Sequence, residues 1–154
     1  MKQFLKFMTD LALLVNQVKK LFGESVLVLH GVISIGTDII EIDRIEAAAS
    51  HGKRFLSRVF TNQEIAFCTR RRNPWPGLAA RFAAKEAVFK ALGSGVTAWH
   101  EVEIHGGGNQ PVQVILTGMA AQIARSKHID KVLISVSHDR ERAIAFATAI
   151  SKGE

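Results

Sequence analysis

The sequence predicts a single α+β domain in which helices pack on a mostly antiparallel sheet. Helical patterns occupy most of the first half of the chain, and short β-branched runs occupy most of the second half. This order lacks the regular βαβ alternation of a doubly wound fold. A chain of 154 residues with 47% apolar composition is large enough for one hydrophobic core.

Residues 1–30 are expected to form an N-terminal extension ahead of a domain that spans 31–154. Apolar residues recur at spacings of four and three between residues 4 and 22, which is typical of an amphipathic helix. Asp10, Asn16 and Gln17 interrupt the run, which is therefore too short and too polar to span a bilayer. We expect this helix to pack against protein; contact of its lysines with an anionic membrane surface is the less favoured alternative.

The next segment predicts two short strands followed by a helix. The β-branched runs Val26–Leu29 and Val32–Ile35 favour strands, and the second leads into Gly36 and Asp38. Asp38 is therefore expected at the end of a strand. A helix is expected from 39 to 49, with three isoleucines facing inward: Ile39, Ile42 and Ile45.

Two further helices are expected in the middle of the chain. The T-x-x-E pattern of Thr61–Glu64 predicts a capping box at the start of one of them. The prolines and glycine of 74–77 then predict a loop. Alanine-rich residues 81–92 predict the second helix, which Gly93 is expected to end.

The remaining chain predicts four strands and one helix. The helix is expected over Gly118–Ser126, between the second and third of these strands. Alternating β-branched residues and intervening turns place the strands as follows: Val102–Ile104, Val112–Leu116, Val132–Ser137 and Ala143–Ala149.

The charge and cysteine content narrow the possible partners and compartment. The net charge is +6, with basic residues concentrated in the middle of the chain, so an acidic partner is expected. Nucleic acid, an anionic membrane, a phosphorylated small molecule and an acidic protein all meet that condition. Cys68 is the only cysteine, which excludes an intrachain disulfide and is consistent with a reducing, cytoplasmic compartment.

Glu86 is the first candidate for chemistry, because it lies in a largely apolar stripe with Phe82 and Phe89. A buried carboxylate needs a partner. Within this segment the simpler partner is Lys90, four residues on, and the alternative is a divalent cation that also binds phosphate. A second carboxylate, Asp38, shifts the balance toward Mg²⁺, which typically takes one or two carboxylates together with water and phosphate oxygens.

Other residues are suited to phosphate binding. His138 follows alternating polar residues at a strand end, where it can donate a hydrogen bond to a phosphate oxygen or remain a solvated surface group. Lys85 and Lys90 can neutralise phosphate charge. The turn Gly93-Ser94-Gly95 offers backbone N–H groups to a phosphate, or serves only as a helix C-cap.

In order along the chain, three motifs resemble the holo-acyl-carrier-protein synthases, which are small 4′-phosphopantetheinyl transferases. The motifs are Gly36-x-Asp38, the run R-F-A-A-K-E-A that begins at Arg81, and Ser-x-Ser-His that ends at His138. The pattern runs from about Ile33 to the C-terminus. It implies that family's single-domain fold and Mg²⁺-dependent transfer of phosphopantetheine from coenzyme A to a serine of apo-acyl carrier protein. Adenosine 3′,5′-bisphosphate would be released, in support of fatty acid biosynthesis.

The resemblance also implies residue roles. Asp38 and Glu86 match the family's metal ligands, and Lys90 and His138 match groups near the coenzyme A pyrophosphate; together they form the expected catalytic set. Arg81 and the 93–95 turn match the nucleotide-binding region. The acceptor of the serine proton stays open at this point.

Docking and assembly are further expectations from the resemblance. Basic residues of the family's first helix bind the acidic recognition helix of the carrier protein, which places docking on Arg44 and, with it, Arg54 and Arg58; a solvated basic face is the alternative. Short members of the family form homotrimers with active sites between subunits. Typical members lack about thirty residues present here, so 1–30 is either a misassigned start, with translation beginning near Val32, or a genuine addition that packs on the trimer.

Two competing readings remain. A nucleic-acid-binding module would use the arginines of 70–72 with Trp75 as a stacking group, but no recognised nucleic-acid motif accompanies them. An inactive relative would have lost Asp38, Glu86 or Lys90, and the sequence retains all three.

Overall fold

The structure is a computed structural model that describes residues 31–52, 54–108 and 110–151. The amphipathic helix expected within 4–22 and the strand expected at Val26–Leu29 lie outside the described residues. The division into 1–30 and 31–154 therefore stays a prediction.

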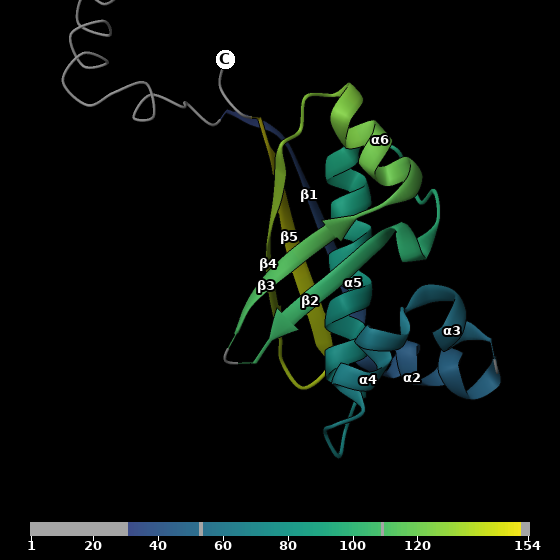
Figure 1. Ribbon diagram of the computed structural model, residues 1–154. Coiled ribbons are helices and arrows are strands. Elements are labelled where there is room, and N and C mark those ends of the chain that lie inside the picture. The colour runs from purple at the N-terminus through teal and green to yellow at the C-terminus, as the bar shows by residue number, and fades with distance from the viewer. Residues whose placement is uncertain (1–30, 53, 109, 152–154) are drawn as a thin grey trace, which may run out of the picture. The chain divides into compact units, whose positions relative to one another are not determined.

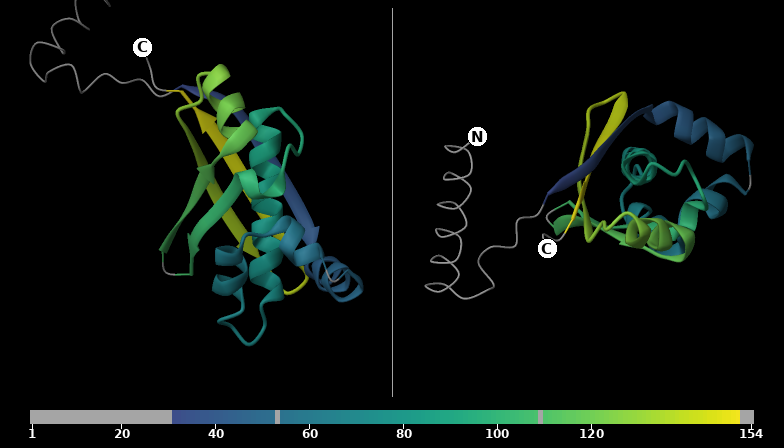
Figure 2. Two further views of the ribbon diagram at one scale, coloured as in Figure 1. Left: turned by 45° about the vertical axis from the view of Figure 1, so that its right-hand side comes forward. Right: turned by 90° about the horizontal axis from the view of Figure 1, so that it is seen from above.

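The α+β fold is confirmed, with one long helix, α5, at its centre (Figures 1 and 2). A three-stranded antiparallel sheet, in the order β1-β5-β4, packs against α5, and the hairpin β2–β3 forms a second sheet. The elements are β1 (Val32–Glu41), α2 (Ile42–His51), α3 (Phe55–Val59), α4 (Asn62–Cys68), α5 (Trp75–Leu92), η2 (Trp99–Glu101), β2 (Val102–Gly107), β3 (Gln110–Leu116), α6 (Gly118–Ser126), β4 (Lys131–His138) and β5 (Arg142–Ile150).

Helix α5 is buried on almost every side because small side chains surround its axis. Seen from above in Figure 2, it lies within a ring of the other elements. A helix enclosed in this way must be apolar around its whole circumference, and alanine allows neighbours to come close. Its fully buried alanines are Ala79, Ala83, Ala84 and Ala87.

The start of α5 differs from the sequence prediction. The segment 74–77 was expected to be a loop, but α5 begins at Trp75 and Pro76 lies in its first turn. Proline is tolerated there because the first N–H groups of a helix have no intrahelical acceptor. The end agrees with the prediction, since Gly93 adopts a left-handed φ of 63° just after Leu92.

Strand β1 reaches α5 through a very close backbone contact at Gly36. A Cβ atom at this position would lie 2.1 Å from the Ala87 carbonyl oxygen and 2.6 Å from the Ala91 nitrogen. Only glycine fits this space. Because side chains alternate along a strand, Asp38 and Ile40 share the helix-facing side of β1 with Gly36.

The boundary between β1 and α2 was predicted wrongly. The helix expected from residue 39 begins at Ile42, because β1 continues to Glu41 in register with β5. Ile39 pairs with Ile144 and is 58% exposed on the outer face of the sheet instead of facing inward; Ile42 and Ile45 are buried as expected. Asp38 therefore lies inside a strand and not at its end.

Several local predictions are confirmed. The capping box is present, with the Glu64 side chain accepting from the Thr61 N–H and the Thr61 side chain accepting from the Glu64 N–H. Helix α6 has the predicted bounds, and the four predicted strands all form, each slightly longer than expected. These elements depend on short-range patterns, which a sequence displays directly.

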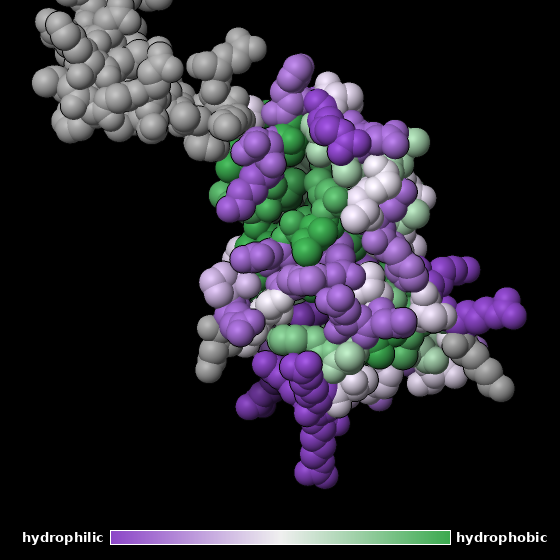
Figure 3. Space-filling model, in the orientation of Figure 1, coloured by the Kyte–Doolittle hydropathy of each residue, from purple (hydrophilic) through white to green (hydrophobic). Residues whose placement is uncertain are grey.

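The three-stranded sheet leaves an apolar outer face. Its exposed side chains, 44–58% accessible, are Ile35, Ile39, Leu133, Ile144 and Phe146. Beside it, an apolar hollow runs between β3 and β4, lined in part by Val112, Val114 and Ile134 (Figure 3). Exposed apolar surfaces of this kind commonly bind another protein chain. Within the described ranges, no helix has both the length and the apolar character needed to cross a membrane.

We predict that Gly36→Ala destabilises the fold by about 3 kcal/mol, because the new methyl group must push β1 away from α5. Urea unfolding of the purified protein measures this change. Thr37→Ala is the matched control, since it shortens an exposed side chain of the same strand and is expected to change stability by less than about 0.5 kcal/mol. Equal effects of the two substitutions would contradict the proposed contact.

Candidate functional site

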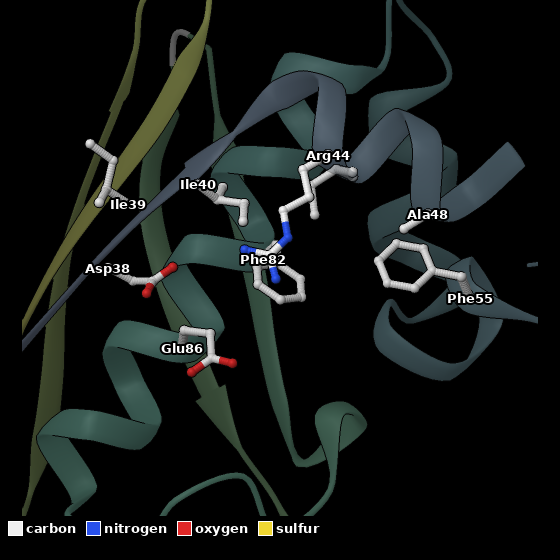
Figure 4. Close-up of a pocket in the computed structure, with 9 residues that line it drawn as sticks. Asp38, Ile39, Ile40, Arg44, Ala48, Phe55, Phe82 and Glu86 are labelled. Atoms are coloured by element: carbon white, nitrogen blue, oxygen red, sulfur yellow. The ribbon is translucent and has the colours of Figure 1, made fainter. Parts of the chain in front are cut away.

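The first candidate site is a cavity of about 380 Å³ between β1, α2 and α5, here called the carboxylate pocket. Figure 4 shows Asp38 on β1 and Glu86 on α5 facing the same space, with Arg44 reaching in from α2. The wall also contains Phe82 and Phe55. Polar groups are thus held in a partly apolar cavity, which is typical of ligand sites.

Lys90 binds Asp38 and not Glu86. Its Nζ lies 2.8 Å from Asp38 Oδ1 and donates a second hydrogen bond, 2.9 Å long, to the Thr37 carbonyl oxygen. The Lys90 side chain remains 50% exposed, whereas the Asp38 side chain is only 15% exposed. The Glu86–Lys90 ion pair, the simpler alternative in the sequence, is therefore not formed.

Glu86 is left as a carboxylate without a full counter-charge. Burial and the nearby charge of Asp38 raise the pKa of Glu86, and Lys90 opposes them. Two carboxylates in one pocket, one with a raised pKa, are the donor set expected for a divalent cation. Across the described ranges no group of three His, Cys, Asp or Glu residues could hold a metal. The two carboxylates fit Mg²⁺ better than a metal such as Zn²⁺, which needs three or four protein ligands.

The second candidate site is a cavity of about 210 Å³ between α4, α5, β4 and the β2–β3 hairpin, here called the arginine pocket. Arg81 is only 6% exposed. Its Nη2 donates to the Gly106 carbonyl oxygen at 2.7 Å, and its guanidinium carbon lies 4.3 Å from the centroid of the Phe67 ring. Arg81 Nε is buried and has no hydrogen-bond partner among the described residues, so the guanidinium keeps one unused donor.

Further basic groups and a glycine turn line the arginine pocket. Arg71, His138, Gly107 and Gly108 contribute to its wall. Both glycines have positive φ angles, of 103° and 70°, which expose backbone in the turn of the hairpin. The sequence predicted a ligand role for Arg71 only in the nucleic-acid alternative, and none for this turn. The run of three glycines from Gly106 was the available signal.

The structure divides the predicted site residues between two sides of α5. Glu86 and Phe82 face the carboxylate pocket, whereas Arg81 faces the arginine pocket, about 100° around the helix from Phe82. His138, which ends β4, lines the arginine pocket and does not line the carboxylate pocket. Within one chain, His138 and Arg81 are therefore separate from the Asp38–Glu86 pair.

The predicted role of Lys85 in phosphate binding is wrong. Lys85 was expected to neutralise phosphate charge, but its side chain is fully buried and its Nζ lies 2.8 Å from Glu64 Oε2. The ammonium also donates to the carbonyl oxygens of Val59 and Trp99, at 2.9 and 3.0 Å. All three donors are used, so none is available to a phosphate. Burial lowers the pKa of Lys85, and Glu64 opposes this shift.

The turn Gly93-Ser94-Gly95 is first of all a helix cap. The N–H groups of Gly93 and Ser94 donate to the carbonyl oxygens of Lys90 and Phe89 at the end of α5. This is the alternative that the sequence left open, and it occupies two of the three N–H groups expected to face a phosphate. Gly95 has open space around it.

The expected docking arginines lie on the surface near the carboxylate pocket. Arg44 is exposed on α2 and also lines that pocket, and Arg54 and Arg58 are exposed at either end of α3. Trp75, the stacking group of the nucleic-acid reading, is half-buried at the start of α5 and packs against the core. The nucleic-acid hypothesis therefore lacks a fully exposed ring at Trp75 on which a base could stack.

Comparisons with known proteins agree on one family. The family model described as the 4′-phosphopantetheinyl transferase superfamily matches residues 34–147. A holo-[acyl-carrier-protein] synthase of Desulforudis audaxviator is 47% identical over 127 residues, which cover 80% of this chain and 96% of the relative.

Solved structures give the same result for the fold. Holo-ACP-synthase from Plasmodium yoelii matches with a TM-score of 0.71 and 28% identity, over 80% of this chain and 98% of that one. The holo-[acyl-carrier-protein] synthase of Helicobacter pylori, solved in complex with coenzyme A, matches with a TM-score of 0.64 and 28% identity, over 75% of this chain and 98% of that one.

We predict that Glu86→Gln raises the melting temperature of the metal-free protein at about pH 7. A raised carboxyl pKa means that the charged form opposes folding above the folded-state pKa. The amide removes that opposition, so the gain should shrink as pH falls through the raised pKa and Glu86 becomes protonated. Calorimetry across a pH series measures it, with Glu46→Gln on the exposed side of α2 as control. A gain that grew toward acid pH would contradict the assignment.

Proposed function

Because the chain belongs to the 4′-phosphopantetheinyl transferase superfamily, we propose that it is a holo-[acyl-carrier-protein] synthase. It transfers phosphopantetheine from coenzyme A to a serine of apo-acyl carrier protein, with Mg²⁺, releases adenosine 3′,5′-bisphosphate and supports fatty acid biosynthesis. The observation that carries the proposal is the pair Asp38 and Glu86 in one pocket, because the pair retains the negative charge that a divalent cation would balance.

The carboxylate pocket is the proposed reaction centre. Asp38 and Glu86 would hold Mg²⁺, which when bound would neutralise charge on the pyrophosphate of coenzyme A. Lys90 is half-exposed at the edge of the Asp38 carboxylate, where it can reach the same pyrophosphate. Because Asp38 already accepts a hydrogen bond from Lys90, its position in the pocket is fixed before substrate binds.

The arginine pocket is the proposed site for a phosphate-bearing part of coenzyme A. Arg81 offers a buried donor there, and Arg71 and His138 add basic groups to the wall. The relative from Helicobacter pylori was solved with coenzyme A, which supports this ligand class. The role assigned to Lys85 in the sequence is not retained, and Gly95 is the remaining part of the 93–95 turn that is free to contact the nucleotide.

Assembly as a homotrimer would bring the two pockets together. Each chain holds its carboxylates and His138 in different pockets, so one complete site needs halves from two neighbouring subunits. The outer face of the three-stranded sheet supports such an assembly, because it exposes Ile39, Ile144 and Phe146 to solvent in a single chain. Residues 31–154 would form the transferase domain in each subunit.

Carrier docking is proposed on Arg44, Arg54 and Arg58. Arg44 lines the carboxylate pocket, so an acidic helix held there would bring its serine close to the reaction centre. We propose that the protein works in the cytoplasm. Cys68 is a buried free thiol, and a free thiol fits a reducing compartment.

The proposal predicts that the protein, incubated with apo-acyl carrier protein, coenzyme A and Mg²⁺, increases the carrier's mass by one phosphopantetheine group. Mass spectrometry of the carrier measures this. Glu86→Gln should retain the fold and lower turnover at least about a hundredfold, because one of two metal ligands is lost. Glu46→Gln is again the control.

No modification by the folded wild-type protein across a series of salt and metal concentrations would overturn the transferase proposal. Tight binding of a nucleic acid by that same inactive protein would favour the basic-module reading. Coenzyme A binding without transfer would favour an inactive relative.

The shared site predicts complementation between two defective subunits. Glu86→Gln and His138→Ala trimers should each be nearly inactive, because every site lacks one half. A one-to-one mixture refolded together should recover activity at about one quarter of its sites, since each site draws its two halves independently. Recovery is measured by the carrier mass assay. Mixed trimers that stay inactive would contradict a site between subunits.

A further inference from the structure

A buried ion pair connects three of the elements that enclose the arginine pocket. Lys85 on α5 and Glu64 on α4 lie 2.8 Å apart, and their side chains are 0% and 1% exposed. Glu64 Oε1 also accepts a 2.9 Å hydrogen bond from the Ile104 N–H on β2. The pair therefore joins α4, α5 and β2 through charged side chains that have no access to solvent.

The same three elements form part of the wall of the arginine pocket, which β4 also lines with Val136 and His138. Helix α4 contributes Phe67 and Cys68, α5 contributes Arg81, and β2 contributes Gly107. Arg81 precedes Lys85 by one helical turn, so both point from the same side of α5. Lys85 Nζ extends the connection further, to the carbonyl oxygens of Val59 and Trp99.

Stability alone does not account for this pair. Replacing a buried ion pair with apolar side chains of similar volume is often neutral or stabilising, because burying two charges carries a large desolvation penalty. What the pair supplies is a fixed geometry, since each hydrogen bond defines both a distance and a direction. The geometry that it fixes is the separation of α4, α5 and β2.

We propose that Lys85 and Glu64 are positioning residues that hold the walls of the arginine pocket at the spacing needed for coenzyme A. The inference rests on the proposed function. Glu86 follows Lys85 in the chain but faces the other pocket, where Asp38 and Lys90 are fixed by contacts that involve neither member of the pair. Loss of the pair should therefore weaken coenzyme A binding more than it slows the chemical step.

The experiment compares two variants with a stability control. Lys85→Met leaves the Glu64 charge buried without a cation, so a large loss of stability is expected. Lys85→Met/Glu64→Gln removes both charges; the single amide oxygen can still accept from the Ile104 N–H, whereas the Thr61 N–H loses the second carboxylate oxygen as its acceptor. Ile129→Ala is the control, because it truncates a buried core residue that does not line the arginine pocket. Each is measured for melting temperature, for kcat and KM with coenzyme A, and for adenosine 3′,5′-bisphosphate binding by calorimetry.

The double variant carries the decisive result. We expect it to recover part of the stability lost by Lys85→Met, because no unpaired charge stays buried, yet to keep a KM for coenzyme A raised about tenfold, or about 1.4 kcal/mol. Its Kd for adenosine 3′,5′-bisphosphate should rise in parallel, and kcat should change less than threefold. Ile129→Ala should lose stability without that change in KM.

Three outcomes would overturn the positioning role. One is recovery of both stability and KM in the double variant, which would make the pair structural only. The second is an equal rise in KM for Ile129→Ala, and the third is a fall in kcat with KM unchanged. All require an active wild-type enzyme. A wild-type protein that binds coenzyme A yet modifies no carrier would refute the proposed function while leaving the binding measurements to test the pair.

Discussion

The contact between Gly36 and the backbone of α5 is the constraint on which the arrangement of the site depends. It fixes the distance between β1 and α5, because no side-chain atom fits between the Gly36 Cα and the Ala87 carbonyl. Two residues on, Asp38 then faces the helix at the level of Glu86 and Lys90. A larger residue would separate the two carboxylates along with the two backbones. The two residues of the Gly-x-Asp motif therefore act together: Gly36 sets the distance between β1 and α5, and that distance places the Asp38 carboxylate beside Glu86.

Two adjacent charged residues of α5, Lys85 and Glu86, differ in how deeply they are buried and in whether they have a partner of opposite charge. Lys85 is fully enclosed, and every donor of its ammonium is satisfied by Glu64 or by a carbonyl oxygen. Glu86, the next residue, is half-buried and has no equivalent partner, so burial and Asp38 raise its pKa. The satisfied pair favours one rigid geometry. The unsatisfied carboxylate favours a bound cation. The proposed structural role of Lys85 and the proposed metal-binding role of Glu86 thus fall on adjacent residues.

Sequence reasoning succeeded where a pattern is local and failed where depth or topology decides. The capping box at Thr61 and the bounds of α6 follow from residues within one or two turns. The sequence could not show that pairing with β5 carries β1 past Ile39, because periodicity alone does not distinguish a strand from a buried helix over so short an apolar run. Nor could it show that Lys85 is buried or that His138 lies in another pocket from Glu86. Those facts depend on packing between segments that are distant in the chain.

The unpartnered Nε of Arg81 would link the lifetime of the protein to any anion that binds in the arginine pocket. The guanidinium donates from Nη2 to the Gly106 carbonyl oxygen, but its buried Nε has no acceptor among the described residues, so an anion that supplied one would stabilise the folded chain. A ligand that binds only the folded chain lowers the unfolded fraction by mass action. Proteases act on that fraction, so cells with abundant anionic ligand would degrade the chain more slowly than cells depleted of it. The supply of the small molecule would then contribute to the abundance of the protein without any change in its synthesis.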